Sequence, residues 1–144
     1  MSQLVVFIGQ KPAGMTPDQA MLYRGVRILR KLGDRVMVAG TAPIWPDGHV
    51  DPDPEEQASR CLEIMLGALT EAGATPADVV RTRSFVTDAG VQDAVGRAHG
   101  RIFGAIRPAS TMVVVAGLVD DRWKVEMEAE AIIGSAAGHS PDDA

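Results

Sequence analysis

The chain has 144 residues, of which 46% are hydrophobic and 23% charged, and its formal net charge is −5 at pH 7. These values predict one globular domain. No apolar run is long enough to span a membrane. The acidic balance argues against a nucleic-acid partner, because binding to nucleic acid usually needs a basic surface. A single cysteine, Cys61, excludes an intramolecular disulfide. The N-terminus also lacks the pattern of a signal peptide, so we expect a cytoplasmic protein.

The first half of the chain predicts a β-hairpin, a loop and a helix. Residues 22–40 are expected to form the two arms of the hairpin around a glycine turn. Arginines spaced three apart in the first arm would also fit a helix, but the returning apolar arm favours strands. Prolines, glycines and acidic residues make 41–53 a loop. A helix is predicted over 54–72, since Asp53 suits its N-cap and its apolar residues recur on one side.

The second half begins with a strand and another helix. Residues 78–88 are rich in β-branched side chains and predict a strand. Residues 89–104 predict a helix with one apolar side, and Gly96 and Gly100 lie four apart along this helix. Each glycine costs about 1 kcal/mol relative to alanine in a helix. We therefore expect another backbone, or a partner chain, to pack against that part of the helix.

Two C-terminal strands of different pattern complete the domain. Residues 110–118 are almost wholly apolar and predict a buried, central strand. Residues 123–133 alternate between apolar and charged side chains, which predicts a strand with one buried and one polar face. The small, polar tail 135–144 is expected to be disordered, so a single domain spans residues 1–134. The order of elements predicts an α+β fold with two helices on one face of a single sheet.

Several segments of this domain resemble the Rid (YjgF) family of enamine and imine deaminases. They include "VMVAGTAP", "AVGRAHGRIFG", "RPASTMVVVAGL" and "KVEMEAEAI", and the resemblance extends from about Tyr23 to Gly134. It implies a chorismate-mutase-like fold and a homotrimer whose clefts between subunits bind a small molecule. Such a trimer would supply the partner chain expected against the glycine pair.

One motif departs from the family pattern. In deaminating members, a proline-alanine-arginine-serine motif supplies an arginine that holds the substrate carboxylate in a bidentate pair. The matching residues here are Pro108, Ala109, Ser110 and Thr111, so Ser110 stands in place of the arginine and carries no charge. Arg107 lies at a different place on the backbone, before the proline. The resemblance therefore implies an arginine-less branch, for which 2-aminoacrylate and similar imines are poor substrates.

The resemblance also implies the residues of the site. Glu126 matches the family's glutamate that handles the attacking water, and it is the predicted catalytic residue. The predicted ligand-binding residues are Tyr23, Gly40, Arg107, Ser110 and Thr111. Plain structural interpretations compete with these: a solvated strand face for the glutamate, a surface cation at a helix end for the arginine, and hydroxyls that satisfy backbone groups at a strand entrance.

No metal or cofactor is predicted. His49, His99 and His139 have no ligand-like spacing with one another or with Cys61. The segment "VAGTAP" lacks the lysine and the spacing of a phosphate-binding loop. Cys61 lies on the apolar side of its helix and is interpreted as a core residue.

Three functions from different classes remain open on the sequence. The first is a hydrolase for an imine, an enamine or a similar electrophile without a free carboxylate, with Glu126 acting on water. The second is a non-catalytic ligand-binding or chaperone-like trimer, favoured by the missing arginine. The third is an endoribonuclease, which ranks last because the chain is acidic and shows no aromatic and basic platform for RNA.

Overall fold

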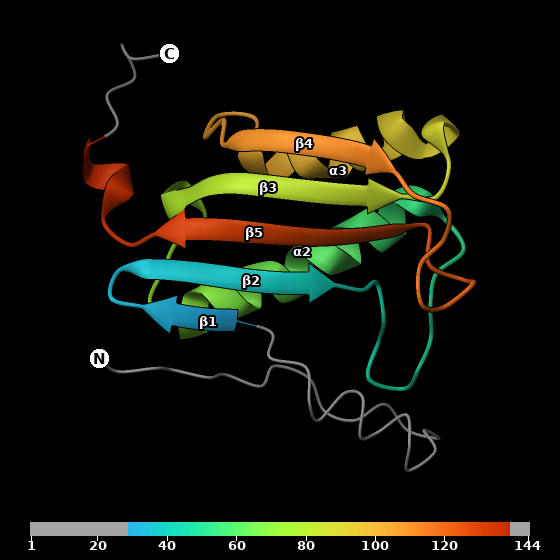
Figure 1. Cartoon of the computed structure of the whole chain (residues 1–144), viewed down its shortest axis with the longest axis horizontal. Helices are drawn as coiled ribbons and strands as arrows, with labels where there is room; N and C mark the ends of the chain where they lie inside the picture. The colour runs from blue at the N-terminus through green and yellow to red at the C-terminus, as the bar shows by residue number, and fades with distance from the viewer. Residues whose placement is uncertain (1–28, 139–144) are drawn as a thin grey trace.

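The computed structural model describes residues 29–138 as one five-stranded sheet backed by helices (Figure 1). The strands are β1 (Leu29–Leu32), β2 (Arg35–Thr41), β3 (Val79–Val86), β4 (Ala109–Val114) and β5 (Val125–Ile132). Their order across the sheet is β1-β2-β5-β3-β4. All neighbouring strands are antiparallel except β3 and β4, which are parallel because α3 connects them. From residue 29 onward the predicted hairpin is confirmed by β1 and β2, while residues 22–28 lie outside the described part of the chain. The sheet with its two helices confirms the predicted fold class.

Both long helices, α2 (Pro54–Glu71) and α3 (Gln92–Phe103), lie on the same face of the sheet (Figure 1). The predicted start of α2 is confirmed, because the Asp53 carboxylate accepts a hydrogen bond from the backbone N–H of Glu56 at 3.1 Å. The second helix begins with a short 3₁₀ turn, η2 (Ala89–Val91), before α3. Each helix therefore starts close to where its sequence signals place it.

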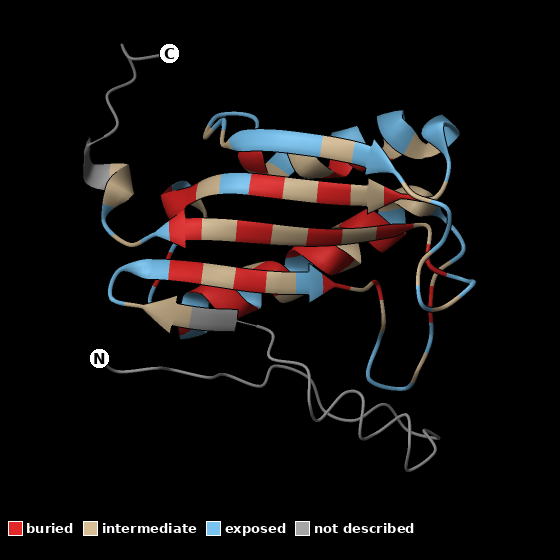
Figure 2. Cartoon of the chain, in the orientation of Figure 1, coloured by how far each residue is buried: buried red, intermediate tan, exposed pale blue. Residues whose placement is uncertain are grey.

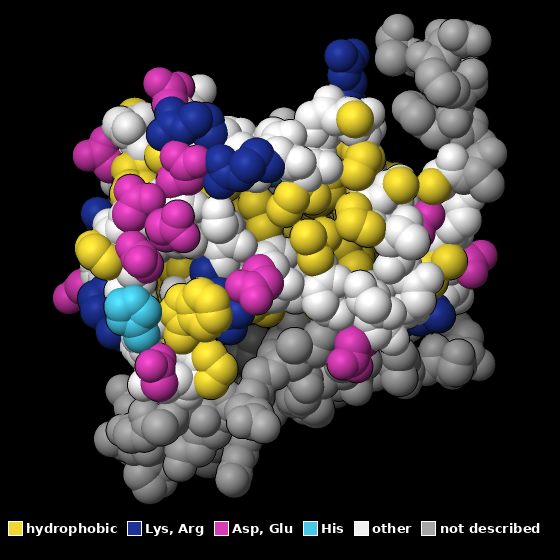
Figure 3. Space-filling view, turned by 180° about the vertical axis from the view of Figure 1, so that it is seen from behind, with side chains coloured by type: hydrophobic (Ala, Val, Ile, Leu, Met, Phe, Trp, Pro, Cys, Tyr) yellow, Lys and Arg dark blue, Asp and Glu magenta, His cyan; other side chains and the backbone are white. Residues whose placement is uncertain are grey.

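The core fills the space between the helices and the sheet. Its largest fully buried side chains include Leu62, Met65, Leu69, Phe103 and Met127. Cys61 is fully buried, which confirms this cysteine as a core residue, and the burial raises the pKa of its thiol. Viewed from the helix side, hydrophobic side chains gather over the middle of the molecule and many charged side chains at one end (Figure 3). Within residues 29–138, no helix combines the length and the apolar character needed to cross a membrane.

The prediction of a buried, central strand at 110–118 is wrong. β4 lies at the edge of the sheet and is mostly exposed (Figure 2). Val113 and Val114 keep 42% and 58% of their surface exposed. The reason is topological: the β3–α3–β4 crossover places β4 on the outer side of β3, and β5 occupies the inner side.

The two glycines of α3 do not pack against another backbone of the described chain, which was one of the two expectations. Both are exposed, and apart from the adjacent residues and the nearby backbone of α3 itself, no described atom lies within 4 Å of a Cβ built at Gly96 or Gly100. No other part of the described chain therefore packs against them. The alternative, that a partner chain packs against the two glycines, stays a prediction about the assembly.

The C-terminal segment begins with a short 3₁₀ helix, η3 (Ser135–Gly138), in a stretch for which the sequence predicts disorder. The Asp78 carboxylate accepts hydrogen bonds from the backbone N–H groups of Gly134 at 3.1 Å and Ala136 at 3.4 Å. It also accepts one from Thr75, and these bonds hold the pKa of Asp78 below its usual range.

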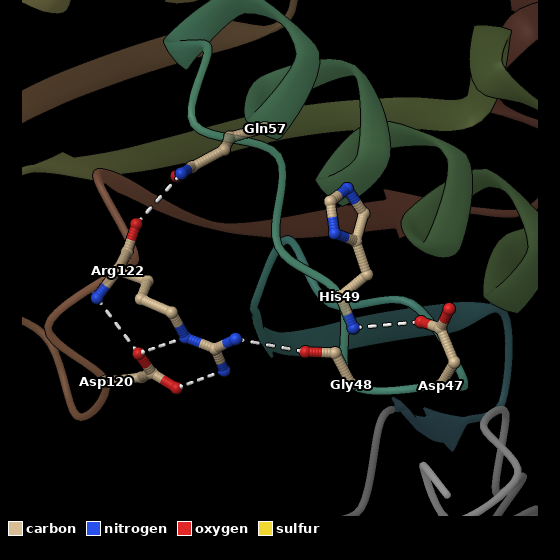
Figure 4. A network of polar contacts seen from close by, with 6 residues as sticks. All are labelled: Asp47, Gly48, His49, Gln57, Asp120 and Arg122. Atoms are coloured by element: carbon tan, nitrogen blue, oxygen red, sulfur yellow. Dashed lines mark hydrogen bonds and ion pairs between the residues drawn. The ribbon is translucent and has the colours of Figure 1, made fainter.

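A polar network joins the two loops that precede α2 and β5 (Figure 4). The Gln57 side-chain amide, which is buried, donates to the backbone oxygen of Arg122 at 2.9 Å. The Arg122 guanidinium donates to the backbone oxygen of Gly48 at 3.1 Å. The same Gln57 amide donates to the backbone oxygen of Asp51 at 2.7 Å, so it links loop 42–53 to loop 115–124. Because a buried amide is costly to leave unpaired, these bonds stabilise this end of the sheet.

Candidate functional site

The face of the sheet opposite the helices carries a row of glutamates on β5. Glu126, Glu128 and Glu130 alternate with buried residues, so all three point away from the helices. Arg83 Nη1 lies 2.9 Å from Glu128 Oε1, and Arg83 Nη2 lies 3.7 Å from Glu130 Oε1. Arg35 Nη2 lies 2.9 Å from Glu130 Oε2. Two of the three carboxylates are therefore ion-paired.

Glu126 is the exception. Among the described residues it has no hydrogen-bond or ion-pair partner, and its neighbour on β3 is Phe85. Half-burial, together with the negative charge of Glu128, raises the pKa of Glu126. A carboxylate with a raised pKa is a stronger base, which suits it for taking a proton from water. The lack of an ion-pair partner among the described residues separates Glu126 from the other two glutamates of the row.

Gly40 lies beside this carboxyl group. A Cβ at Gly40 would stand 3.1 Å from Oε1 of Glu126, closer than nearly all real contacts of that kind. The absent side chain leaves room for the carboxyl group on the open face. Thr111 is exposed on the same face, where Arg83 is its partner on β3. Three of the predicted site residues, Gly40, Thr111 and Glu126, thus share one face of the sheet.

Ser110 points to the other face. Its Oγ accepts a hydrogen bond from Thr82 Oγ1 at 3.1 Å, and Thr82 Oγ1 lies 2.8 Å from Nε2 of His99 on α3. Thr82 is fully buried, His99 is half-buried and Ser110 is exposed. Burial lowers the pKa of His99 and favours its neutral form.

Sequence reasoning missed this cluster. Thr82 and Ser110 are paired only because β3 and β4 run parallel, and an apolar, central β4 was expected instead. For His99, the sequence addresses only the spacing of metal ligands. No spacing along the chain signals that the three side chains meet.

Arg107 stands at the entrance to β4 in an unusual conformation. Its φ is +56°, in the left-handed region that residues other than glycine seldom occupy, and its N–H donates to the Phe103 oxygen at 2.8 Å to end α3. The side chain is exposed and has no ion-pair or hydrogen-bond partner within residues 29–138. It is thus an unneutralised cation near Ser110 in sequence.

The remaining predictions concern Tyr23 and metal ligands. Tyr23 lies outside the described residues, as does His139. Between residues 29 and 138, no three histidine, cysteine, aspartate or glutamate side chains gather in a way that could hold a metal ion.

The sheet separates the two groups that could take part in a reaction, the carboxyl group of Glu126 and the hydroxyl of Ser110. Glu126 lies on the open face in the middle of the sheet, whereas Ser110 lies on the helix-facing side of the edge strand. A small molecule that touches both groups must lie where two chains meet or wrap around the edge of the sheet. One protomer alone does not bring them together.

Comparison with known proteins identifies a family to which this chain is similar. A family model described as endoribonuclease L-PSP matches residues 19–133. The uncharacterized protein SCO2049 of Streptomyces coelicolor is 39% identical over 104 residues, which cover 72% of this chain and 78% of SCO2049. TdcF of Escherichia coli K12, whose name describes a reactive intermediate deaminase, is 30% identical over 105 residues, which cover 70% of this chain and 81% of TdcF.

Solved structures share the fold. The crystal structure of Rv2704 from Mycobacterium tuberculosis, a member of the YjgF/YER057c/UK114 family, matches with a TM-score of 0.73 at 35% identity, covering 92% of this chain and 100% of that chain. The crystal structure of E. coli TdcF with bound serine matches with a TM-score of 0.74 at 24% identity, covering 91% of this chain and 98% of that chain.

Proposed function

We propose that this chain, which belongs to the Rid (YjgF) family, binds a small metabolite in clefts between the subunits of a homotrimer. In these clefts it hydrolyses an imine, an enamine or a related electrophile. The observation that carries the proposal is Glu126, the one glutamate of its row that no described arginine neutralises. Its half-buried carboxylate would take a proton from the attacking water. The name of TdcF as a reactive intermediate deaminase supports the same class of reaction.

The proposed substrate carries no free carboxylate. A carboxylate is best held by the planar fork of an arginine, and the hydroxyl of Ser110 offers no charge at the corresponding place. Arg107 is the nearest alternative, but its left-handed backbone belongs to the turn that ends α3. We propose that it does not replace the missing arginine. TdcF, by contrast, has been crystallised with serine, an amino acid.

Three features support assembly from several copies. Val113 and Val114 are exposed on the edge strand, and Gly96 and Gly100 leave a side of α3 open. In addition, Glu126 and the Ser110 cluster lie on opposite faces of one protomer, and a second chain would bring such groups together in one cleft. Light scattering at micromolar concentration is expected to give the mass of three chains, and a monodisperse monomer would contradict the proposal.

A matched pair of probes tests the reaction. 2-Aminoacrylate and its amide, 2-aminoacrylamide, differ only in the group that an arginine would bind. We expect the protein to accelerate ammonia release from the amide and not from the acid. Glu126→Gln is expected to lower the rate by about 100-fold or more, the usual contribution of a general base, whereas Glu128→Gln keeps it. An active Glu126→Gln protein would contradict the role of this glutamate.

Two further variants examine the arginine. Ser110→Arg is expected to raise activity toward 2-aminoacrylate if the rest of the cleft still accepts that substrate. Brisk wild-type activity on 2-aminoacrylate that disappears in Arg107→Ala would show instead that Arg107 has taken over the carboxylate, and would overturn the proposed specificity.

The replacement of the motif arginine by Ser110 also favours a second candidate, a non-catalytic ligand-binding or chaperone-like trimer. In that case the protein binds small uncharged molecules without converting them. Binding of 2-aminoacrylamide without any ammonia release above the uncatalysed rate would favour this function over hydrolysis.

A further inference from the structure

Three polar side chains form a continuous hydrogen-bonded chain from α3 to the exposed edge of the sheet. His99 Nε2 lies 2.8 Å from Thr82 Oγ1, and Thr82 Oγ1 lies 3.1 Å from Ser110 Oγ. The middle member is fully buried, and the last member is exposed. The chain therefore connects a half-buried imidazole to a hydroxyl that a ligand can reach.

The two contacts fit a single direction of proton donation once Thr82 is assigned as the donor to Ser110. The Thr82 hydroxyl has one proton and donates it to Ser110. The 2.8 Å contact between Thr82 and His99 then needs the imidazole to donate, so the proton of the neutral ring is on Nε2. Ser110 accepts from Thr82 and keeps its own proton for a group outside the chain. Nδ1 of His99 has no partner within residues 29–138 and is the unprotonated nitrogen.

We propose that His99, Thr82 and Ser110 form a proton relay, in which Ser110 is the catalytic acid that protonates the nitrogen of an uncharged imine and the other two are positioning residues that replenish its proton. This inference rests on the proposed function and adds to it the residue that serves the leaving nitrogen. It also accounts for Ser110 at a place where a carboxylate-binding arginine is expected, because a hydroxyl donor suits a neutral substrate.

The step balances in atoms and charge. Water adds to the imine carbon, a C–O bond forms, and the electron pair of the C=N bond moves to nitrogen, which takes the proton of Ser110. Thr82 passes a proton to Ser110, Nε2 of His99 passes one to Thr82, and Nδ1 takes one from solvent. The added water releases one proton to the base or to solvent. The resulting carbinolamine then moves its hydroxyl proton to nitrogen, its C–N bond breaks, and ammonia and a carbonyl compound leave.

Two features distinguish this cluster from a set of satisfied core hydroxyls. First, Ser110 is exposed, although its partner Thr82 is fully buried. Second, Gly96 lies one turn before His99 on α3 and leaves open space, since apart from its neighbours and the nearby backbone of α3 no described atom lies within 4 Å of a Cβ built there. Burial also keeps the imidazole neutral at pH 7 by lowering the pKa of His99, and a neutral ring is what can donate from one nitrogen and accept at the other.

A ligand-independent measurement tests the direction of the relay. ¹⁵N NMR of the histidine side chains at pH 7 is expected to show the Nε2–H tautomer for His99, assigned by its loss in His99→Gln. Thr82→Val should shift this signal, and Thr82→Ser, which keeps the hydroxyl, should leave it near the wild-type position. A dominant Nδ1–H tautomer would reverse the donor order and overturn the proposal.

Kinetics with 2-aminoacrylamide test the catalytic role. Ser110→Ala is expected to lower kcat by about 100-fold, and Thr82→Val and His99→Phe by about tenfold or more, while Thr82→Ser retains most of the rate. Thr70→Val and His49→Phe, which remove a hydroxyl and an imidazole far from the cluster, serve as controls with wild-type rates. An active wild type whose rate is unchanged in Ser110→Ala would overturn the relay alone, whereas an inactive wild type would refute the proposed hydrolysis and the relay with it.

Discussion

The last two strands along the chain, β4 and β5, occupy positions in the sheet opposite to those that their side chains suggest. β5 carries a glutamate at every second position from Glu126 to Glu130, yet it lies in the middle of the sheet between β2 and β3. β4 leads into an almost wholly apolar run, yet it lies at the edge with Val113 and Val114 exposed. A strand's position in the sheet is set by how it is connected, and its side chains report what covers each face.

The difference also separates two kinds of polar group. On β5, the charged groups face away from the helices, where Arg83 and Arg35 pair with two of them. On β4, the polar group that faces the helix side, Ser110, is hydrogen-bonded into a neutral chain with Thr82 and His99. The central strand thus contributes a carboxylate and the edge strand a hydroxyl to the proposed chemistry.

The largest effect is expected from shortening a methionine on each strand. Met127 on β5 is fully buried, and Met112 on β4 is partly buried against the same core. Met127→Ala should lower the free energy of unfolding by about 2–5 kcal/mol because it leaves a cavity. Met112→Ala should cost clearly less, since its side chain already meets solvent. Urea denaturation of both variants measures this, and equal losses would show that β4 is as buried as β5.

The next effect concerns the exposed edge. Val114→Lys should change the stability of the protomer by no more than about 0.5 kcal/mol, as surface substitutions usually do. If β4 is covered by another copy, the same change should weaken assembly by about 1–3 kcal/mol per subunit, because a charge would be buried without a partner. Light scattering across a dilution series distinguishes the two. Val119→Lys, in an 86% exposed loop position, is the matched control, and identical masses for both variants would remove β4 from the interface.

Two glutamates of β5 are expected to respond with opposite signs. Glu128→Gln breaks the contact with Arg83 and should lower stability by up to about 1 kcal/mol. The pKa of Glu126 is raised above its ordinary 4.5, so its charged form is less favourable in the folded state than in the unfolded state. Stability is therefore lost as the pH rises through this raised pKa, and Glu126→Gln should recover less than about 1 kcal/mol at pH 7 after solvent screening.

Thermal unfolding at several pH values checks this pair. The gain in Glu126→Gln should disappear below about pH 4, where the carboxyl group is protonated in both states. A loss of stability in Glu126→Gln at pH 7 would mean that its carboxylate has a stabilising partner.

The smallest effect belongs to the histidine behind β4. Burial lowers the pKa of His99 below its ordinary 6.5, so the unfolded state binds more protons as the pH falls through that range. Wild-type stability should therefore decrease between pH 7 and pH 5, by less than about 1 kcal/mol for a half-buried group. His99→Gln should flatten this slope, whereas His49→Gln, at an exposed position, should not. An unchanged slope in His99→Gln would show that the imidazole is freely solvated.

The sequence by itself determined the elements and the character of the last strand. Asp53 at the start of α2, the apolar side of that helix and the alternation around Glu126 are local patterns, because a cap and a repeat of two or 3.6 residues need only neighbours along the chain. Together with the resemblance to the Rid family, they predicted the fold class and placed Glu126 and Gly40 among the site residues.

Only the tertiary structure decided which residues meet across the sheet. The parallel pairing of β3 with β4 moved the apolar strand to the edge and brought Thr82 beside Ser110, and the packing of α3 added His99. Arg83 likewise pairs with Glu128 and Glu130, and Glu126 has no partner among residues 29–138. Such contacts join residues far apart in sequence, and they depend on strand order and register, which a shift of one residue would reverse from one face to the other.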